Sequence, residues 1–249
     1  MLLTDKVAII TGGAGLNGLG FATAREMAAH GARVVILDLA AAEPAKAAAL
    51  LGEQHMGLVA SVTDKVAIDA AIDQVVATLG RVDILINNAG ITQSRKTVDI
   101  SASDYDAVLD VSLRGTLLMS QAVIPVMERQ GSGSIVCISS VSAQRGGGIL
   151  GGPHYSAAKA GVLGLARAMA RELGGSGIRV NCITPGLIGT EIIKGKLPEE
   201  RKSEIAETIP LARLGRPSDI AGACVFLGSD LSSYCTGVTL DVNGGMLIH

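Results

Sequence analysis

A regular alternation of short β-branched runs with longer helical segments constrains the fold of this chain more than any other feature. Runs of strand type occupy Val7–Ile10, Arg33–Leu37, Met56–Ala60, Val82–Asn87, Ser134–Ser139, Arg179–Ile183 and Thr239–Val242. The segments between them predict helices over Gly18–His30, Glu43–Leu51, Asp64–Leu79, Asp104–Gln130 with a bend near Pro125, Tyr155–Leu173 and Pro217–Gly228. Repeated βα units form a parallel sheet with right-handed crossovers. The sequence therefore predicts a single α/β domain over residues 1–249, a doubly wound, seven-stranded parallel sheet with helices on both faces.

The composition agrees with such a sheet and gives no sign of a nucleic-acid or membrane partner. Hydrophobic residues make up 48% of the chain and aromatic residues only 2%, so aliphatic side chains must build the core. Such side chains suit strands that are buried on both faces. The net charge is −2 and like charges form no run, which removes the electrostatic reason to expect nucleic acid or an anionic membrane. No apolar stretch reaches the roughly 20 residues that span a bilayer.

The cysteines and histidines are scattered rather than grouped as metal ligands. Cys137, Cys182, Cys224 and Cys235 show neither CxxC nor zinc-ligand spacing, and the histidines are equally dispersed. The N-terminal residues run directly into a strand pattern without the cleavage region of a signal peptide. We therefore expect reduced thiols, no metal site and a cytoplasmic protein.

A glycine-rich turn follows the first predicted strand and has the spacing of a dinucleotide site. Gly13-x-Gly15-x-x-Gly18 precedes a helix, and Asp38 ends the second predicted strand. Glycines let the backbone approach a pyrophosphate, and the helix N-terminus offers free N–H groups to it. Asp38 can accept hydrogen bonds from the adenosine ribose hydroxyls and repel a 2′-phosphate. The arrangement predicts NAD as the cofactor; the alternative is a tight turn with Asp38 capping a loop.

Several further motifs occur in order along the chain. They are Thr11-Gly12 with Gly18-Leu-Gly20, Asn87-Asn-Ala-Gly90, Ile138-Ser-Ser-Val141, Tyr155-Ser-Ala-Ala-Lys159, Asn181 with Pro185-Gly186, and Asp241-Val-Asn-Gly-Gly245. Together they resemble the short-chain dehydrogenase/reductases. The resemblance covers essentially the whole chain. It implies a single-domain Rossmann fold and an NAD-dependent enzyme that acts on a CH–OH group.

The candidate catalytic residues are Ser140, Tyr155 and Lys159. Tyr155 and Lys159 are one helical turn apart on the same face. A phenol is a poor base at neutral pH, and we expect the neighbouring ammonium and the oxidised nicotinamide to lower the pKa of Tyr155. Tyr155 would then exchange a proton with the substrate oxygen while Ser140 orients that oxygen. We expect Ser139 and Ser142 to be loop or capping hydroxyls.

The resemblance also implies a set of cofactor contacts. Lys159 would hold the nicotinamide ribose, Ser61 and Val62 would lie against the adenine, and the backbone of Ile188 would hold the carboxamide. The full implied set is Gly12, Asn17, Gly18, Leu19, Asp38, Ser61, Val62, Asn88, Ala89, Gly90, Tyr155, Lys159, Pro185, Gly186, Ile188 and Thr190.

The chain departs from the family pattern at three places. The glycine turn is two residues longer, which leaves open whether Gly15, Leu16 or Asn17 faces the phosphates. Ser61 replaces a common aspartate, which could weaken the adenine contact. Ser112 stands where the family has an active-site asparagine that is thought to hold a water in a proton relay. A serine hydroxyl can still bind a water, so either the relay is rebuilt or the enzyme is altered.

The substrate is less constrained than the cofactor. We favour a small, fairly polar secondary alcohol and its ketone. Arg145 or Arg95 could bind an anionic group, but we favour a solvated surface arginine at either position. The alternatives are a 3-oxoacyl-thioester reductase, which usually uses NADPH, and a non-catalytic NAD-binding regulatory protein. An enoyl reductase fits less well because such enzymes typically place the tyrosine further from the lysine.

The resemblance further implies a substrate lid over about residues 187–210 and a homotetramer. The apolar helical stretches Leu117–Ile124 and Leu163–Met169 could pack across a twofold interface. Gln144–Pro153 should line one wall of the substrate site, and Gln93, Ser94 and His154 could also reach it.

Overall fold

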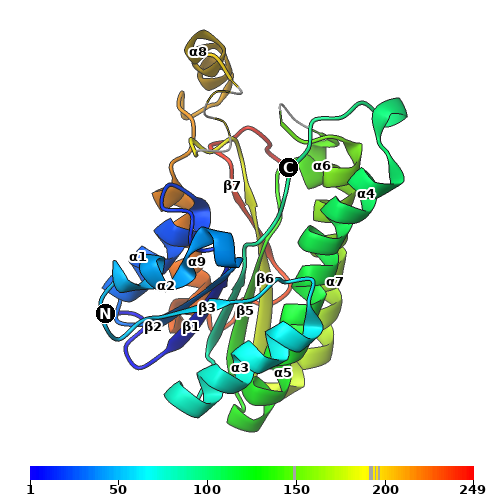
Figure 1. Ribbon diagram of the computed structural model, residues 1–249. Helices are drawn as coiled ribbons and strands as arrows, with labels where there is room; N and C mark the ends of the chain where they lie inside the picture. The colour runs from blue at the N-terminus through cyan, green and yellow to red at the C-terminus, as the bar shows by residue number, and fades with distance from the viewer. Residues whose placement is uncertain (148–149, 191–192, 194, 196) are drawn as a thin grey trace.

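Seven parallel strands form one sheet in the computed structural model, which describes residues 1–147, 150–190, 193, 195 and 197–249 (Figure 1). The order across the sheet is β3-β2-β1-β4-β5-β6-β7. The predicted doubly wound parallel fold is confirmed. The strands are β1 Val7–Thr11, β2 Arg33–Asp38, β3 Met56–Val59, β4 Ile84–Asn87, β5 Gly133–Ile138, β6 Ile178–Pro185 and β7 Thr239–Val242.

Helices cover both faces of the sheet (Figure 1). One face carries α1 (Leu19–Ala29), α2 (Pro44–Ala49) and α9 (Pro217–Gly228). The other carries α3 (Lys65–Leu79), α5 (Gly115–Gln130) and α7 (Pro153–Leu173). Three more helices were not separately predicted: α4 (Ala102–Leu109), α6 (Ser142–Arg145) and α8 (Glu199–Thr208). Figure 1 shows α8 standing clear of the sheet at the end where the functional loops gather.

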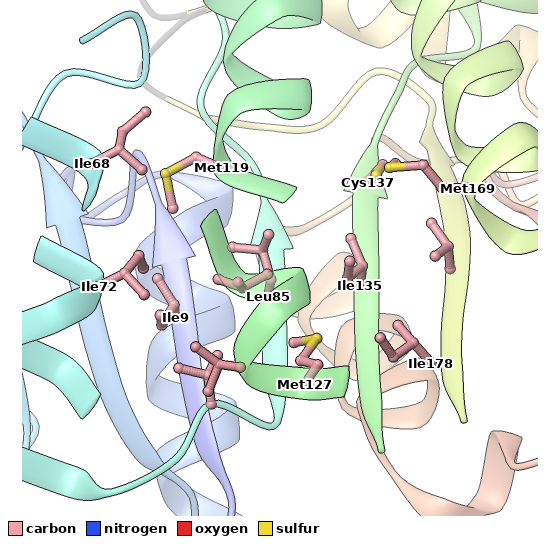
Figure 2. Packing of buried hydrophobic residues seen from close by; sticks show 14 of the residues in the cluster. Ile9, Ile68, Ile72, Leu85, Met119, Met127, Ile135, Cys137, Met169 and Ile178 are labelled. Carbon is pink, nitrogen blue, oxygen red and sulfur yellow. The ribbon is translucent and has the colours of Figure 1, made fainter. Parts of the chain in front are cut away.

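Aliphatic side chains fill the space between the sheet and the helices. Figure 2 shows Ile68 and Ile72 of α3 and Met127 of α5 packed toward Ile9 and Leu85 of the central strands. All five side chains are at most 3% exposed. Successive residues of β1 contribute to opposite faces, since Ile9 belongs to one core and Ile10 to the other. This two-sided burial explains why the strands read as continuous apolar runs.

The order in which strands are added to the sheet reverses between β1 and β4. These two strands are hydrogen-bonded neighbours, while the chain proceeds from β1 toward β2 on one side and from β4 toward β5 on the other. The loops that follow the two strands must therefore diverge and leave a crevice at their carboxyl ends.

The predicted long helix is interrupted, but not where the sequence suggested. The bend was expected near Pro125, yet Pro125 lies inside α5, and the interruption is a π-helical turn at Asp110–Arg114 between α4 and α5. The helix also begins earlier than predicted, because Ser101 and Asp104 form a capping box. Pi-helical turns are often found at functional sites, and this one contains Ser112.

The segment Ala102–Gln130 is long and apolar enough to cross a membrane by length and composition alone. In the structure it lies against the sheet, and Met119, Val123 and Met127 are fully buried in the core. This packing buries 39% of the apolar window of the segment.

Candidate active site

A cleft of about 780 Å³ opens at the carboxyl ends of β1, β4, β5 and β6. It lies at the crevice expected from the change of direction in the sheet. Most of the predicted cofactor residues line it, namely Gly12, Gly18, Leu19, Asn88, Ala89, Gly90, Tyr155, Lys159, Pro185, Gly186, Ile188 and Thr190. The loops after these four strands therefore bring together residues that are far apart in the sequence.

The glycine turn after β1 is held close to the loop after β4. The amide nitrogen of the Asn88 side chain donates to the carbonyls of Thr11 and Gly12 at 2.9 and 3.0 Å. A Cβ atom at Gly12 would lie 2.9 Å from the Cα of Ala89, and one at Gly20 would lie 2.5 Å from the Gly12 carbonyl oxygen. Only glycine fits at either position, so the backbone of this turn stays accessible from the cleft.

The lengthened turn projects away from the cleft at its tip. Leu16 is 54% exposed, and the Gly18 amide closes the turn by donating to the Gly15 carbonyl at 2.8 Å. Gly18 precedes the first residue of α1 and has no side chain to cap it. Gly18 and Leu19 line the cleft, whereas Gly15, Leu16 and Asn17 do not. The helix N-terminus thus presents its backbone N–H groups to the cleft.

Asp38 lies at the end of β2 beside the glycine turn. One carboxylate oxygen accepts a hydrogen bond from the Ala14 amide at 2.9 Å, and the other accepts one from the Leu39 amide at 2.8 Å. Asp38 lies outside the lining of the 780 Å³ cleft, but its carboxylate is fixed at the border of the turn that the cleft includes. A fixed negative charge there can accept from hydroxyls and repel a phosphate.

Ser61 and Val62 are placed differently from the other predicted cofactor residues. The Ser61 hydroxyl closes a local turn with Thr63, whose amide donates to it at 3.2 Å. Val62 is buried against α5, because a Cβ atom at Gly115 would lie 2.7 Å from its Cγ2 atom. Neither residue lines the cleft.

Ser140, Tyr155 and Lys159 meet on one wall of the cleft. Ser140 follows β5, while Tyr155 and Lys159 lie in α7. The Ser140 hydroxyl oxygen accepts a hydrogen bond from the Ser142 amide at 3.1 Å, which fixes it toward the cleft. The Lys159 ammonium lies 5.9 Å from the centre of the Tyr155 ring. The three candidate catalytic residues are therefore brought together as the sequence predicted.

In the protein chain without a bound ligand, burial has the largest effect on the pKa of Tyr155. It raises the pKa of the Tyr155 phenol, and the hydrogen bond to Ser140 acts in the opposite direction with a smaller effect. The expectation that Lys159 lowers this pKa is wrong for the chain alone. Burial outweighs the lowering effect of the Ser140 hydrogen bond on this pKa, and the Lys159 ammonium donates to the Ile138 carbonyl at 2.8 Å.

The lysine is itself strongly affected by burial. Lys159 is 4% exposed, and the loss of solvent lowers its pKa to about 8. Cys137 and Cys182 lie on neighbouring strands in register and act in the opposite direction on that pKa. A lysine that can lose its proton near neutral pH can take part in proton transfer as well as hold a charge.

The neighbouring serines have structural partners. The Ser139 hydroxyl donates to the Lys159 backbone carbonyl at 2.7 Å and thereby ties β5 to α7. Ser142 begins α6, and its amide donates to Ser140. Both also border the cleft, so the structure gives them supporting roles beside Ser140.

Ser112 lies beside Lys159 although it does not line the cleft. A Cβ atom at Gly90 would lie 3.4 Å from the Ser112 hydroxyl oxygen and 3.2 Å from the Lys159 ammonium. The Ser112 hydroxyl is fully buried and has no hydrogen-bond partner among the described residues. A buried hydroxyl of this kind is a candidate for binding an internal water.

Other predicted wall residues turn away from the cleft. Arg95 pairs with Asp104 at 3.4 Å, and His154 lies 3.1 Å from the Gln93 side-chain oxygen. Gln93, Ser94, Arg95 and His154 are all absent from the cleft lining. The predicted wall Gln144–Pro153 and lid 187–210 include positions 148, 149, 191, 192, 194 and 196, which lie outside the described residues.

The sequence did not single out several residues of the substrate side. They are Thr92, Arg201, Glu204, Ile205, Thr208 and Met246, which line the cleft from three separate segments. The predicted lid range covers α8, which carries four of them. No local pattern shows that this polar helix faces a cleft, because that placement appears only in the folded chain.

The amino-acid sequence has relatives among known proteins. A family model described as enoyl-(acyl carrier protein) reductase matches residues 12–247. The chain is 55% identical over 100% of both chains to an uncharacterized short-chain type dehydrogenase/reductase from Sinorhizobium fredii. It is 41% identical, again over 100% of both chains, to a 3-oxoacyl-(acyl-carrier-protein) reductase from Thermotoga maritima. It is 39% identical to nodulation protein G from Azospirillum brasilense, over 98% of this chain and 99% of the relative.

The glycine turn yields a test of the cofactor site. In Gly20→Ala the new Cβ atom would lie 2.5 Å from the Gly12 carbonyl oxygen and 2.7 Å from the Asn88 amide nitrogen, so the turn must shift. We expect NADH affinity, measured by fluorescence titration, to fall by about tenfold or more. Gly222→Ala in α9 is the matched control, since its Cβ would meet nothing within 4 Å. Equal affinity in a folded Gly20→Ala protein would contradict the assignment.

Proposed function

The chain belongs to the short-chain dehydrogenase/reductase family, and we propose that it is an NAD(H)-dependent enzyme that interconverts a small secondary alcohol and its ketone. The observation that carries this proposal is the meeting of Ser140, Tyr155 and Lys159 on one wall of a cleft whose other side is the glycine turn. An acid/base group beside a dinucleotide cradle suits hydride transfer.

The residues present fit a nicotinamide dinucleotide. The glycine turn and the N-terminus of α1 would hold the pyrophosphate, and Lys159 would hold the nicotinamide ribose. Pro185, Gly186 and Thr190 line the opposite side of the cleft and would contact the nicotinamide. When bound, the nicotinamide ring supplies the hydride acceptor for oxidation and the hydride donor for reduction.

Tyr155 carries the proton. In oxidation the Tyr155 phenolate takes the hydroxyl proton of the alcohol while the hydride leaves the carbinol carbon. In reduction the phenol returns that proton to the oxygen. The Ser140 hydroxyl donates to the substrate oxygen and stabilises the charge that develops on it. Because oxidation needs the phenolate and burial raises the pKa of Tyr155, its rate should rise with pH.

Ser112 would serve in the proton relay that leads from Tyr155 through Lys159. Its unpartnered hydroxyl and the Lys159 ammonium border the same small space beside Gly90. A water held there by Ser112 would accept a proton that leaves Tyr155 through Lys159. This favours a relay rebuilt around serine over an enzyme that has lost it.

Asp38 selects the cofactor in this proposal. Its carboxylate is anchored by two backbone amides at the border of the glycine turn. In that position it would accept from the adenosine ribose hydroxyls, and it would repel the 2′-phosphate of NADP.

A second candidate is reduction of a 3-oxoacyl thioester. The observation that favours it is the 41% identity to a 3-oxoacyl-(acyl-carrier-protein) reductase of equal length. The same three catalytic residues would serve that reaction, so the distinction lies in the substrate. A non-catalytic NAD-binding protein is less well supported, because it would need no acid/base residue. The one-turn spacing of Tyr155 and Lys159 also disfavours enoyl reduction.

A homotetramer is part of the same proposal. The stretches Leu117–Ile124 and Leu163–Met169 lie in α5 and α7 and keep partly exposed apolar residues beside their buried ones. These helices would pack across a twofold axis. Light scattering after gel filtration measures the mass directly.

The proposed reaction is tested by following absorbance at 340 nm with NADH and with NADPH against small ketones, oxo acids, 3-oxoacyl thioesters and enoyl thioesters. We expect turnover with NADH and ketones, faster alcohol oxidation at higher pH, and a loss of about 10²–10⁴-fold in Tyr155→Phe with NADH binding retained. More than a tenth of wild-type turnover in that variant would remove Tyr155 from the acid/base role. Turnover of thioesters alone would favour the second candidate.

Cofactor choice is tested at Asp38. In Asp38→Ala the preference for NADH over NADPH, taken as the ratio of kcat/KM values, should fall by about tenfold or more because the negative charge is gone. Asp38→Asn separates the charge from the hydrogen bonds, and Glu43→Ala removes a nearby exposed carboxylate as a control. If both Asp38 variants keep the wild-type ratio, another feature selects the cofactor.

The relay is tested at Ser112. Ser112→Ala should lower kcat by about tenfold near pH 7, and less at alkaline pH where solvent takes the proton more readily, because the hydroxyl that binds the water is lost. Ser112→Asn should restore activity. Ser156→Ala is the control, since the Ser156 hydroxyl is also buried without a partner among the described residues, but the atoms nearest the space beside Gly90 belong to Lys159 and Ser112. A loss that is the same at every pH would indicate a structural role only.

A further inference from the structure

We propose that the substrate carries a carboxylate and that Arg145 binds it. The inference rests on the proposed alcohol–ketone chemistry and names the substrate class within it: short hydroxy acids and the corresponding oxo acids. It is carried by one observation about the cleft, in which a single charged side chain has no partner among the described residues.

Among the described residues, every charged side chain of the cleft lining except Arg145 has a hydrogen-bond or ion-pair partner. The lining contains Arg145, Lys159, Arg201 and Glu204. Lys159 donates to a backbone carbonyl and serves the catalytic site. Arg201 and Glu204 form an ion pair at 2.5 Å within α8. Arg145 makes no hydrogen bond or ion pair through its side chain in the described part of the chain. Among the described residues of the lining, Arg145, whose side chain is exposed, is therefore the charged residue left without a partner.

Arg145 is close to the catalytic wall because both lie on one short segment. It is the last residue of α6, and Ser140 is five residues earlier in the chain. The segment between them is folded back by hydrogen bonds from the Ala143 amide to the Ser140 carbonyl and from the Arg145 amide to the Val141 carbonyl, both at 3.0 Å. A side chain as long as arginine can reach the space in front of Ser140. A carboxylate bound there would sit a few bonds from the reacting carbon.

The short helix that carries Arg145 is anchored from its other side. The Gln144 side-chain amide donates to Asp241 of β7 at 2.9 Å and lies 3.1 Å from the His249 ring. Asp241 also accepts from the Thr184 hydroxyl. Figure 1 shows the end of the chain beside α6. Since Gln144 fixes the helix, the Arg145 backbone is in place before substrate binds, which lowers the entropy cost of binding.

The pyrophosphate of the cofactor would lie too far from Arg145 to pair with its guanidinium. The pyrophosphate would lie at the glycine turn after β1, whereas Arg145 follows β5, and β4 lies between these strands. Strands are about 4.8 Å apart, so the two sites are separated by about 10 Å. The other arginine that the sequence singled out, Arg95, is paired with Asp104 and outside the lining.

A carboxylate matches the chemistry around Arg145. The guanidinium offers parallel N–H donors that fit two carboxylate oxygens. The nearby lining of Leu150, Leu187, Ile193 and Met246 is apolar and suits a short hydrocarbon chain between the carboxylate and the alcohol. A neutral ketone would gain nothing from the arginine, whereas an oxo acid would gain a charge-assisted contact.

The test compares each acid with an uncharged analogue of the same skeleton. The probes are the enantiomers of 2- and 3-hydroxybutyrate and their methyl esters, oxidised with NAD⁺. We expect wild type to prefer an acid over its ester. In Arg145→Gln, kcat/KM for that acid should fall by about 10- to 100-fold while the value for the ester stays within about twofold. Arg145→Lys should fall in between, and Arg95→Gln should match wild type.

Three results of the acid and ester comparison would overturn the inference. The first is an ester oxidised as well as its acid by wild type. The second is an equal loss for both substrates in Arg145→Gln. The third is weaker NADH binding in that variant, measured by fluorescence, with the acid-to-ester ratio unchanged. Turnover of neutral ketones alone would overturn this inference and leave the proposed function standing. Absence of NADH turnover with every substrate would overturn both.

Discussion

The hydrogen bonds between Thr11 and Asn88 join the two halves of the sheet at the point where the cleft opens. The Thr11 hydroxyl oxygen accepts from the backbone amides of Asn88 and Ala89 at 3.0 Å, and the Asn88 side chain returns to the carbonyls of Thr11 and Gly12. Each such bond contributes about 0.5–1.5 kcal/mol. Their larger effect is geometric, since they fix the glycine turn against the loop that reaches Gly90. These bonds therefore position the glycine turn against the loop that carries Gly90, and Ser112 and Lys159 lie beside Gly90.

Burial sets the electrostatics of the catalytic wall. It raises the pKa of Tyr155 above its ordinary value and lowers the pKa of Lys159 to about 8. Each shift disfavours charge in the protein chain by itself. In the protein chain without a bound ligand, burial therefore favours the neutral phenol of Tyr155 and the neutral amine of Lys159.

The long helical region shows where local sequence patterns were insufficient. Its apolar periodicity predicted a helix correctly, and Pro125 was the obvious place for a bend. Proline is nevertheless accommodated inside α5, and the chain changes its winding at Asp110–Arg114 instead. That change brings the Ser112 hydroxyl inward beside Gly90. The contact depends on packing against α7 and the loop after β4, which no window of the helix sequence contains.

The sequence by itself determined the parallel α/β architecture, the glycine turn, and the identities of Ser140, Tyr155 and Lys159, because each follows from short-range periodicity, residue type or an ordered set of motifs. The tertiary structure alone decided three things. They are the direction of the Tyr155 pKa shift, the placement of Val62 in the core, and the fact that Arg145 lines the cleft whereas Arg95 does not. Burial and pairing cause these differences. The sequence around Arg95 and Arg145 does not show that the first pairs with Asp104 and the second lines the cleft. Only the folded chain shows this difference.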